Sequence, residues 1–327
     1  MLKYIIKRLI SLVPVVFIIS IILFGMLHLM PGDPVRMMMP ENAESIRDPQ
    51  VYEKLYEETK VRYGYDKSIP EQYVRWVGRT VSGNLGYSSM DKKPVIDVIS
   101  TPLKNTLMLN ILSTIVAFFL SIYIGIISAV KKGSFTDRFW QVFSLVGISI
   151  PTFFIALSLI YIFALKLGWF PSNGMPLMPN DGSLDYYLEL LRYLILPAAT
   201  LTVGSLASTS RYVRNAMAEA LSQDYIRTAR SKGLSERVVI YSHAFRNALI
   251  PVVTVVAWSI VGMFGGAAIT EQIFAYNGIG RLLIDSVLAR DFNLVLALNM
   301  FYAVLSLSAN LLMDIGYALV DPRVRLD

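Results

Sequence analysis

Long apolar stretches alternate with polar segments along the whole chain. A helix that crosses the hydrocarbon core of a bilayer needs about 20 mostly apolar residues, and six stretches reach that length. We therefore expect an all-α, multi-pass membrane protein with six transmembrane helices. The predicted spans are Leu9–Met30, Thr106–Val130, Trp140–Leu165, Tyr193–Ser210, Pro251–Thr270 and Asn293–Ala318.

Prolines and hydroxyl side chains interrupt several of these spans. Pro151 falls in the middle of the third span, where a proline is expected to kink a helix. Pro197 and Pro251 are expected near helix starts, where a missing N–H costs little. The fourth span is rich in Ser and Thr, so we expect it to face the protein interior, where hydroxyls find partners.

The first span is expected to remain as an uncleaved anchor. Its apolar run is longer than the roughly 7–15 residues of a signal-peptide core. It also ends in Pro31-Gly32-Asp33-Pro34 and not in a small-x-small cleavage site.

Basic side chains are unevenly shared among the segments between spans. Four segments together hold fifteen Lys and Arg, whereas the two short alternate segments hold four. Short loops rich in Lys and Arg stay in the cytoplasm, so we expect both chain ends to be cytoplasmic. The basic segments are residues 1–8, 131–138, 211–246 and 321–327, and the alternate ones are 166–192 and 271–291.

Composition agrees with this arrangement. Hydrophobic residues make up 54% of the 327 residues, which excludes a disordered chain, and the absence of Cys excludes a disulfide scaffold. The net charge of +6 lies mainly on the predicted cytoplasmic side, so it indicates membrane sidedness and not nucleic-acid binding.

Residues 31–104 form a polar segment that we expect outside the cytoplasm. Tyr73 and Trp76 recur at helical spacing after Ser68-Ile69-Pro70, which predicts an amphipathic helix. Gly83–Tyr87 is typical of a turn. This segment either caps the helix ends or has a role in gating or in receiving a partner.

Catalytic and metal-binding patterns are missing from the sequence. There is no Gly-x-x-x-x-Gly-Lys-Ser/Thr phosphate loop, and the only two histidines, His28 and His243, are predicted on opposite sides of the membrane. Asp314 is the only carboxylate expected inside a span, whereas an intramembrane aspartyl protease needs two. We expect no enzymatic activity, no metal and no cofactor bound by this chain.

Asp314 lies near the cytoplasmic end of the sixth span. We expect a structural ion pair there with Arg211 or Arg214, and a proton relay is the alternative. Polar residues of the fourth and sixth spans are candidates for lining a translocation path. They are Thr202, Ser205, Ser208, Asn299, Tyr302, Ser306 and Asn310.

Residues 212–250 form the longest predicted cytoplasmic loop. A short helix is expected from about Ser222 to Lys232, with Gly233 just after its end. Ala229 and Gly233 would form a small-residue stripe that permits close docking by another protein. The alternative is that the basic residues merely follow the positive-inside rule.

This loop resembles that of binding-protein-dependent ABC importer permeases, in which a small residue precedes a Gly by four positions. The family's later Leu-Pro is absent, since Phe245-Arg246 stands there. Several other motifs resemble the oligopeptide/dipeptide permease branch. They are Pro31-Gly32-Asp33-Pro34, Asp224–Arg230, Lys232-Gly233-Leu234, His243–Pro251, Gly278-Ile279-Gly280-Arg281-Leu282, Arg290-Asp291, and at the end Asn310-Leu311-Leu312, Asp314, Tyr317 and Asp321-Pro322-Arg323-Val324-Arg325.

The resemblance implies a type I importer fold in a prokaryotic inner or plasma membrane. It implies four kinds of partner: a second homologous permease, two cytoplasmic ATPases that hold ATP and Mg, an extracytoplasmic substrate-binding protein, and a peptide substrate. It also implies a coupling helix that docks on the ATPase. The docking residues are expected to be Asp224, Tyr225, Arg227, Thr228, Ala229, Arg230, Lys232, Gly233, Leu234 and Glu236.

We expect four parts in the chain: an anchor helix, an extracytoplasmic insertion, a transmembrane core and a tail. Nickel, glutathione or oligosaccharides are alternative substrates within the same family. A proton-coupled carrier using Asp314, or an assembly factor without transport activity, would be a different class of protein. The parts are residues 1–30, 31–104, 105–318 (with the coupling loop 212–250) and 319–327.

Overall fold

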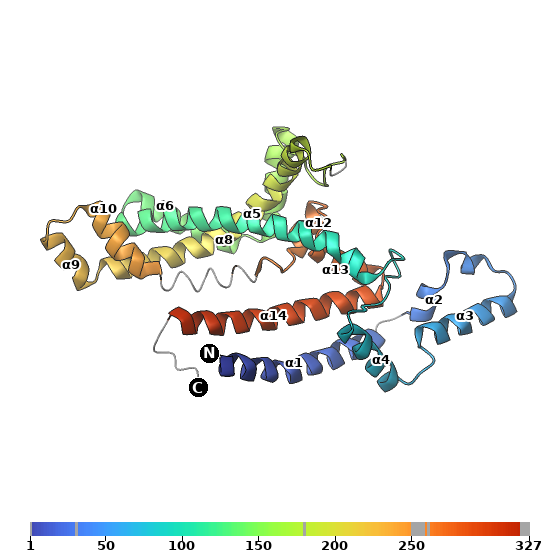
Figure 1. The fold of residues 1–327 in the computed structure, drawn as a ribbon. Helices are drawn as coiled ribbons and strands as arrows, with labels where there is room; N and C mark the ends of the chain where they lie inside the picture. The colour runs from blue at the N-terminus through green and yellow to red at the C-terminus, as the bar shows by residue number, and fades with distance from the viewer. Residues whose placement is uncertain (1, 30–31, 179–180, 250–258, 260–261, 321–327) are drawn as a thin grey trace. The chain divides into compact units, whose positions relative to one another are not determined.

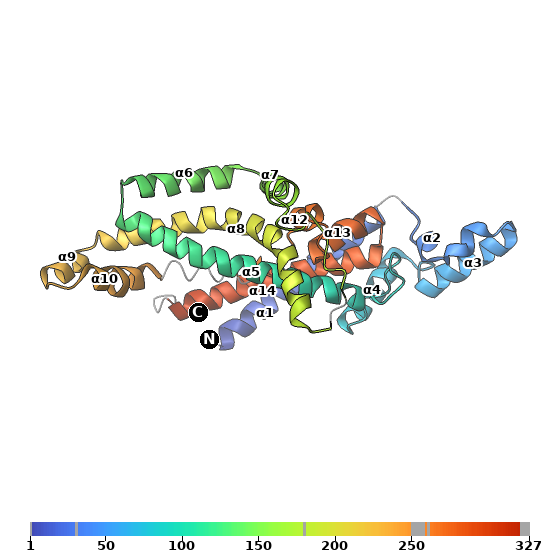
Figure 2. The ribbon, with the colours of Figure 1, turned by 90° about the horizontal axis from the view of Figure 1, so that it is seen from above.

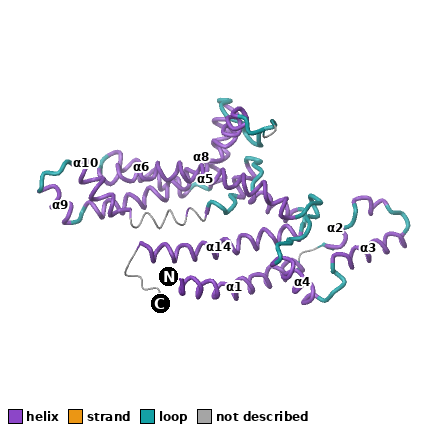
Figure 3. The backbone as a smooth tube through the Cα atoms, viewed as in Figure 1, coloured by secondary structure: helices purple, strands orange, loops and turns teal. Residues whose placement is uncertain are grey.

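The computed structural model is helical almost throughout the residues that it describes (Figures 1 and 3). Its only extended pairing in this part of the chain is an isolated bridge between Tyr87 and Pro94. The backbone is described for residues 2–29, 32–178, 181–249, 259 and 262–320, and the side chains within these ranges are described except for 2–5, 41, 44 and 312–320.

The chain divides into two compact units. One unit contains Leu103–Arg281 and the two chain ends, and the other contains Ile6–Pro102 and Leu282–Leu307. Two long helices, α5 (Val95–Val130) and α14 (Phe292–Val320), each contribute to both units.

The unit built from Ile6–Pro102 and Leu282–Leu307 surrounds a small aromatic core. Phe24, Leu27, Trp76, Phe292 and Leu296 are buried together there. They come from three helices, α1 (Leu2–His28), α4 (Ile69–Val81) and α14. Trp76 belongs to α4, the amphipathic helix predicted from the sequence. Besides the start of α5, most of α13 (Ile279–Leu288) and the first part of α14, the helices of this unit are α1, α2 (Pro34–Met38), η1 (Glu41–Ser45), α3 (Pro49–Tyr63) and α4.

The other unit is a layered arrangement of long helices. In both views α5, α6 (Phe135–Ser149) and α8 (Leu184–Leu221) run alongside one another (Figures 1 and 2). The shorter helices of the unit are α7 (Thr152–Leu159), the π-helical segment η2 (Ile160–Lys166), α9 (Asp224–Ser231), α10 (Glu236–Val238), the π-helical segment η3 (Val239–Phe245), α12 (Ala268–Ile273) and the start of α13 (Ile279–Leu288).

Glycine allows the long helices of this unit to approach closely. A Cβ on Gly125 of α5 would lie 2.6 Å from the Cβ of Val213 on α8, and one on Gly147 of α6 would lie 2.9 Å from the Cβ of Ala207. Small residues at helix crossings are typical of membrane bundles. The hydrophobic effect does not drive helices together in lipid, so close van der Waals packing of their backbones holds them together.

Four helices of the described chain are long and apolar enough to cross a membrane. The candidates are Ile6–His28, Val95–Val130, Leu184–Leu221 and Phe292–Leu311, which overlap the first, second, fourth and sixth predicted spans. A bent pair of helices, Phe135–Ser149 and Thr152–Lys166, is a fifth candidate and overlaps the third span.

Most of the fifth predicted span lies outside the described residues, and so does Pro251. Its described end differs from the prediction. After Gly262 the backbone leaves the helical conformation, and a new helix, α12, begins at Ala268. The Gly265-Gly266 pair accounts for this interruption, because glycine disfavours the helix interior.

Two prolines behave differently from the prediction. At Pro151 the third span does not merely kink but bends by 105°, because Ile150 is extended as residues before proline prefer. Pro197 lies well inside α8 and not near its start. The helix begins earlier because the Ser183 hydroxyl accepts the Tyr186 N–H at 3.2 Å as an N-cap.

Candidate functional site

The predicted helix of the coupling loop forms as α9. It begins at Asp224 and ends at Ser231, one to two residues inside the expected limits. Gly233 has a left-handed backbone (φ +75°), and its N–H donates to the Arg230 carbonyl at 3.0 Å. The Leu234 N–H also donates to the Ala229 carbonyl, at 3.4 Å. These two hydrogen bonds form a Schellman motif, which ends the helix sharply at the predicted glycine.

One side of α9 faces its own chain. Ile226 is fully buried and Ala229 is 5% exposed, and both belong to a core that includes Val213 and Met217 of α8 and Ile126 of α5. The expectation that the small-residue stripe faces a partner is therefore wrong for Ala229. A small side chain here brings α9 close to the long helices, not close to another protein.

The opposite side of α9 is exposed. Arg227 pairs with Asp224 at 3.4 Å, and both side chains are largely in solvent. Nine of the ten predicted docking residues are exposed on the helix and the turn after it, and Ala229 is the exception. The nine are Asp224, Tyr225, Arg227, Thr228, Arg230, Lys232, Gly233, Leu234 and Glu236.

An ion pair, the Arg230–Glu236 clamp, joins the end of α9 to the start of α10. The Arg230 Nε donates to the Glu236 carboxylate at 2.8 Å, and a second nitrogen of the same guanidinium donates at 3.3 Å. Arg230 lowers the pKa of Glu236 by donating these hydrogen bonds. Glu236 begins α10, so the pair holds the turn around Gly233 and Leu234.

The chain after α10 returns to the same core. Val239 and Ala244 of η3 are fully buried with the α8 and α9 side chains. The coupling loop is therefore packed on the ends of α5 and α8 both before and after its exposed surface. In both views α9 and α10 lie at the far end of α8 (Figures 1 and 2).

A buried ion pair joins α6 to α8. Asp137 is 1% exposed and accepts two hydrogen bonds from Arg214, at 2.6 and 2.8 Å. Its carboxylate also accepts the Gly133 N–H at 2.9 Å. Arg214 is one of the two partners expected for Asp314, and the structure pairs it with Asp137. The sequence did offer a signal for this pair, because Asp137 is an acidic residue within the basic segment 131–138.

Asp314 itself lies on α14, but its side chain is outside the described part of the structure. Its role as a structural charge or a proton relay thus stays a prediction. Arg211, the other expected partner, is exposed.

The residues predicted to line a path differ in exposure. Thr202 is buried and donates to the Ser113 carbonyl of α5 at 3.3 Å, so it packs two helices together and does not line a path. Ser205 and Ser208 of α8 are exposed. On α14, Asn299 and Tyr302 are half-buried, whereas Ser306 and Asn310 are exposed.

Sequence reasoning missed a buried carboxylate, Glu271. It is fully buried, and it accepts the Thr106 hydroxyl at 2.8 Å and the Arg281 N–H at 2.9 Å. Gly278 and Gly280 pack directly on its carboxyl group. The signal was present in the closely spaced glycines at 278 and 280, which leave room for this group.

The described residues contain no group of three or more His, Cys, Asp or Glu side chains placed to hold a metal ion. The arrangement instead suits mechanical coupling, because a short exposed helix shares a core with two long apolar helices.

Comparisons with known proteins identify this architecture. Residues 121–326 match the family described as "Binding-protein-dependent transport system inner membrane component", and residues 1–110 match the N-terminal component of the same systems. Among solved structures, an amino acid ABC transporter crystallised with histidines has a TM-score of 0.51 at 17% identity. That match covers 67% of this chain and 92% of the other. The fold is thus that of the transmembrane domain of an ABC importer.

Full-length relatives extend the match to both ends. The oligopeptide transport system permease protein AppB of Bacillus subtilis is 38% identical over 99% of both chains. A putative peptide permease of Brucella ovis is 36% identical over the full length of both chains. The glutathione transport system permease GsiC of Escherichia coli is 34% identical over 99% of both chains. The chain belongs to the family of binding-protein-dependent inner membrane permeases and is a multi-pass protein of the cell membrane.

Proposed function

We propose that this chain is the permease subunit of an ABC importer that moves peptides inward. Its relatives over the full length are named as oligopeptide, peptide and glutathione permeases. Glutathione is itself a tripeptide, so the three names share one chemistry. ATP would be hydrolysed by separate ATPase subunits, a second permease would complete the path, and a binding protein would deliver the substrate.

The shared core of α9, α5 and α8 is the observation that carries this proposal. Ile226 and Ala229 of α9 are buried with Val213 and Met217 of α8. Close-packed interiors transmit displacement because they deform little. A push on α9 by a closing ATPase dimer would therefore move the ends of α5 and α8 and bias the permease between its two states.

The exposed surface of α9 is the proposed contact with the ATPase. Its charged and aromatic groups, Asp224, Tyr225, Arg227 and Lys232, are exposed and can contact a partner. Ala229 is buried on the inner side of α9 and would fix the helix in place. Arg230 and Glu236 would contribute by holding the shape of the loop. The clamp and the Schellman motif keep this surface in one conformation before docking.

Charge reversal on this surface tests the proposal. The double variant Arg227→Glu, Lys232→Glu should leave the permease inserted and folded but reduce co-purification of the ATPase and ATP-driven uptake of a labelled tripeptide by tenfold or more. Charged contacts at interfaces are that sensitive, since about 1.4 kcal/mol corresponds to tenfold. Lys131→Glu is the matched control, because Lys131 is exposed on the same predicted side but lies outside the coupling loop. Normal uptake by the double variant would refute docking at α9.

A further inference from the structure

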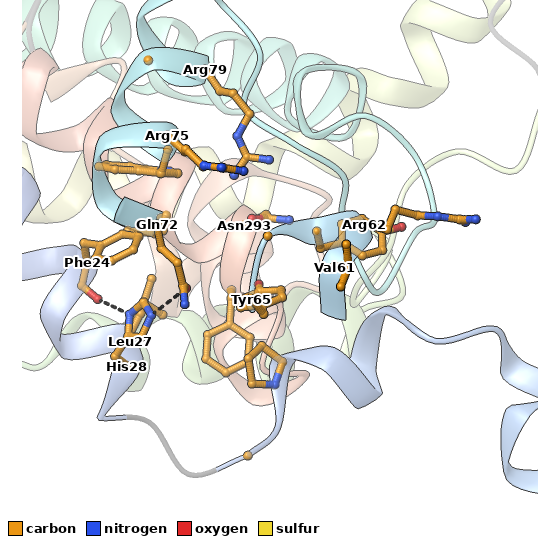
Figure 4. A pocket seen from close by; sticks show the side chains of 18 of the residues that line it. Phe24, Leu27, His28, Val61, Arg62, Tyr65, Gln72, Arg75, Arg79 and Asn293 are labelled. Carbon is orange, nitrogen blue, oxygen red and sulfur yellow. Dashed lines mark hydrogen bonds between the residues drawn. The ribbon is translucent and has the colours of Figure 1, made fainter. Parts of the chain in front are cut away.

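A cavity lies within the unit formed by Ile6–Pro102 and Leu282–Leu307. It has a volume of about 570 Å³ and is lined by residues of α1, α3, α4 and the start of α14 (Figure 4). Sites for small ligands commonly enclose roughly 300–1,000 Å³, so the cavity is large enough for a molecule of a few residues.

Its inner wall is apolar and aromatic. Phe24, Trp76 and Phe292 line it together with two leucines, and the rings of Phe24 and Trp76 have centroids 5.6 Å apart. Tyr65 also lines the cavity, and burial raises the pKa of its hydroxyl to about 12. These groups offer an apolar side chain a dry surface.

Its charged lining is entirely cationic. Arg62, Arg75 and Arg79 line the cavity, and no Asp or Glu is among the lining residues. Arg75 and Arg79 are four residues apart on α4, a spacing at which like charges destabilise a helix. Figure 4 shows both guanidinium groups in the same part of the cavity, whereas Arg62 extends away from them. A bound anion would turn this repulsion into attraction.

Two acidic groups of the same unit already have partners. Glu71 lies outside the lining and pairs with one nitrogen of Arg75 at 2.8 Å, so the other N–H groups of that guanidinium remain for a ligand. Asp291 accepts the Ser88 hydroxyl and the Leu294 N–H, at 2.5 and 3.1 Å. No carboxylate of the described residues forms an ion pair with Arg79, so its guanidinium is available to a ligand.

The cavity also holds an available hydrogen-bond acceptor. Asn293 donates through its Nδ2 to the Tyr87 carbonyl at 2.8 Å, and its Oδ1 has no partner among the described residues. By contrast, both ends of the Gln72 amide are used. Its oxygen contacts His28 at 3.3 Å (Figure 4), and its nitrogen donates to the Lys67 carbonyl at 2.8 Å. Asn293 is therefore the amide that can accept a ligand N–H.

We propose that this cavity binds a small ligand with a free carboxylate and an adjoining apolar side chain, the chemistry of the C-terminal end of a short peptide. Arg75 and Arg79 would bind the carboxylate, since guanidinium groups match carboxylates in shape and charge. The aromatic wall would take the side chain, and the Asn293 Oδ1 would accept a peptide N–H. The choice of a peptide as the source rests on the proposed function.

A phosphate group, free or on a lipid, is the competing ligand of similar charge. One feature of the lining favours the peptide end. Inorganic phosphate bound by Arg75 and Arg79 would leave the aromatic wall unused, whereas the C-terminal residue of a peptide brings an apolar side chain to it. The experiment below separates these sources.

Calorimetric titration of the full chain in phosphatidylcholine nanodiscs, without ATPase, tests the site. The probes are the dipeptide Ala-Phe, its C-terminal amide and inorganic phosphate. We expect saturable binding of Ala-Phe, binding of the amide weaker by about tenfold or more, and no competition from phosphate at equal concentration. The same titration in phosphatidylglycerol nanodiscs should give an unchanged affinity for Ala-Phe.

Variants locate the binding to this cavity. Arg79→Gln should weaken Ala-Phe by about tenfold or more but leave the amide nearly unaffected, because the lost partner is the carboxylate. Arg47→Gln is the matched control, an exposed arginine of the same unit that does not line the cavity. Thermal unfolding of each variant confirms that the unit is folded.

Three outcomes would overturn the inference. The first is the absence of saturable binding of Ala-Phe. The second is an equal loss of affinity for Ala-Phe and its amide in Arg79→Gln. The third is displacement of Ala-Phe by phosphate at equal concentration, or a clearly lower affinity for Ala-Phe in phosphatidylglycerol nanodiscs. The last outcome would assign the cavity to a phosphate group. Because the ATPase is absent, failure here is separable from failure of the proposed function, which ATP-driven uptake by the assembled transporter measures.

Discussion

Helices α4 and α9 are both short and amphipathic, and each packs one side on longer helices of its own unit. They differ in what they bury. Helix α9 buries Ile226 and the small Ala229, which bring its backbone close to α8. Helix α4 buries the large Trp76 and leaves a cavity of about 570 Å³ beside it. The first arrangement suits transmission of movement, and the second suits binding of a small molecule.

The largest effect is expected from removing the aromatic anchor of α4. Trp76→Ala should destabilise its unit by about 3–5 kcal/mol, since it removes a large buried ring. Thermal unfolding of the purified chain measures the loss, and Val74→Ala, at an exposed position of the same helix, is the control. ATPase co-purification should persist. Its loss would mean that α4 and α9 are not independent, and the comparison would fail.

A smaller loss is expected at the buried side of α9. Ile226→Ala should cost about 2–4 kcal/mol through the cavity that it creates. The neighbouring Tyr225→Ala should change stability by less than about 0.5 kcal/mol, because Tyr225 is 40% exposed, but it should weaken ATPase co-purification. Thermal unfolding and ATPase co-purification, measured on both variants, distinguish a residue that stabilises the fold from one that contacts the ATPase. Equal stability losses in the two variants would contradict the division of α9 into an inner and an outer side.

The close helix crossing next to α9 gives a third test. Gly125→Ala should cost about 1–3 kcal/mol by overpacking against Val213, because the new Cβ would lie 2.6 Å from the Cβ of that residue. Gly204→Ala on α8 meets nothing within 4 Å and should be neutral or slightly stabilising. Thermal unfolding of both variants measures the difference. A tolerated Gly125→Ala would show that α5 and α8 can separate. The core beneath α9 would then transmit less of any displacement of α9 to these helices.

The smallest effect concerns the Arg230–Glu236 clamp. Arg230 lowers the folded-state pKa of Glu236 below its ordinary value of 4.5, so the clamp is formed above that pH and is lost as the pH falls through the lowered value. Titration of the labelled Glu236 carboxyl by NMR should give a midpoint below 4.5, which returns towards 4.5 in Arg230→Gln. The same midpoint in the unaltered chain and in Arg230→Gln would show that Arg230 and Glu236 do not form this ion pair in solution.

The sequence predicts the features that depend on neighbouring residues. Apolar length predicted the long helices, and local signals predicted α4 and the end of α9 at Gly233. The face that α9 buries was not predictable, since Ala229 suits a close contact with any partner. Asp137 and Arg214 are 77 residues apart, and no local pattern pairs them. The 105° bend at Pro151 also exceeds what a proline alone predicts.

The hydrogen bond between Thr106 and Glu271 has a consequence for biogenesis. The two residues are 165 positions apart, so α5 is made long before its partner leaves the ribosome. Chains fold from the N-terminus during synthesis, and the Thr106 hydroxyl must be satisfied otherwise until Glu271 arrives. Closing this contact is therefore a late, post-insertion step, and a chain that stops short of residue 271 never completes it.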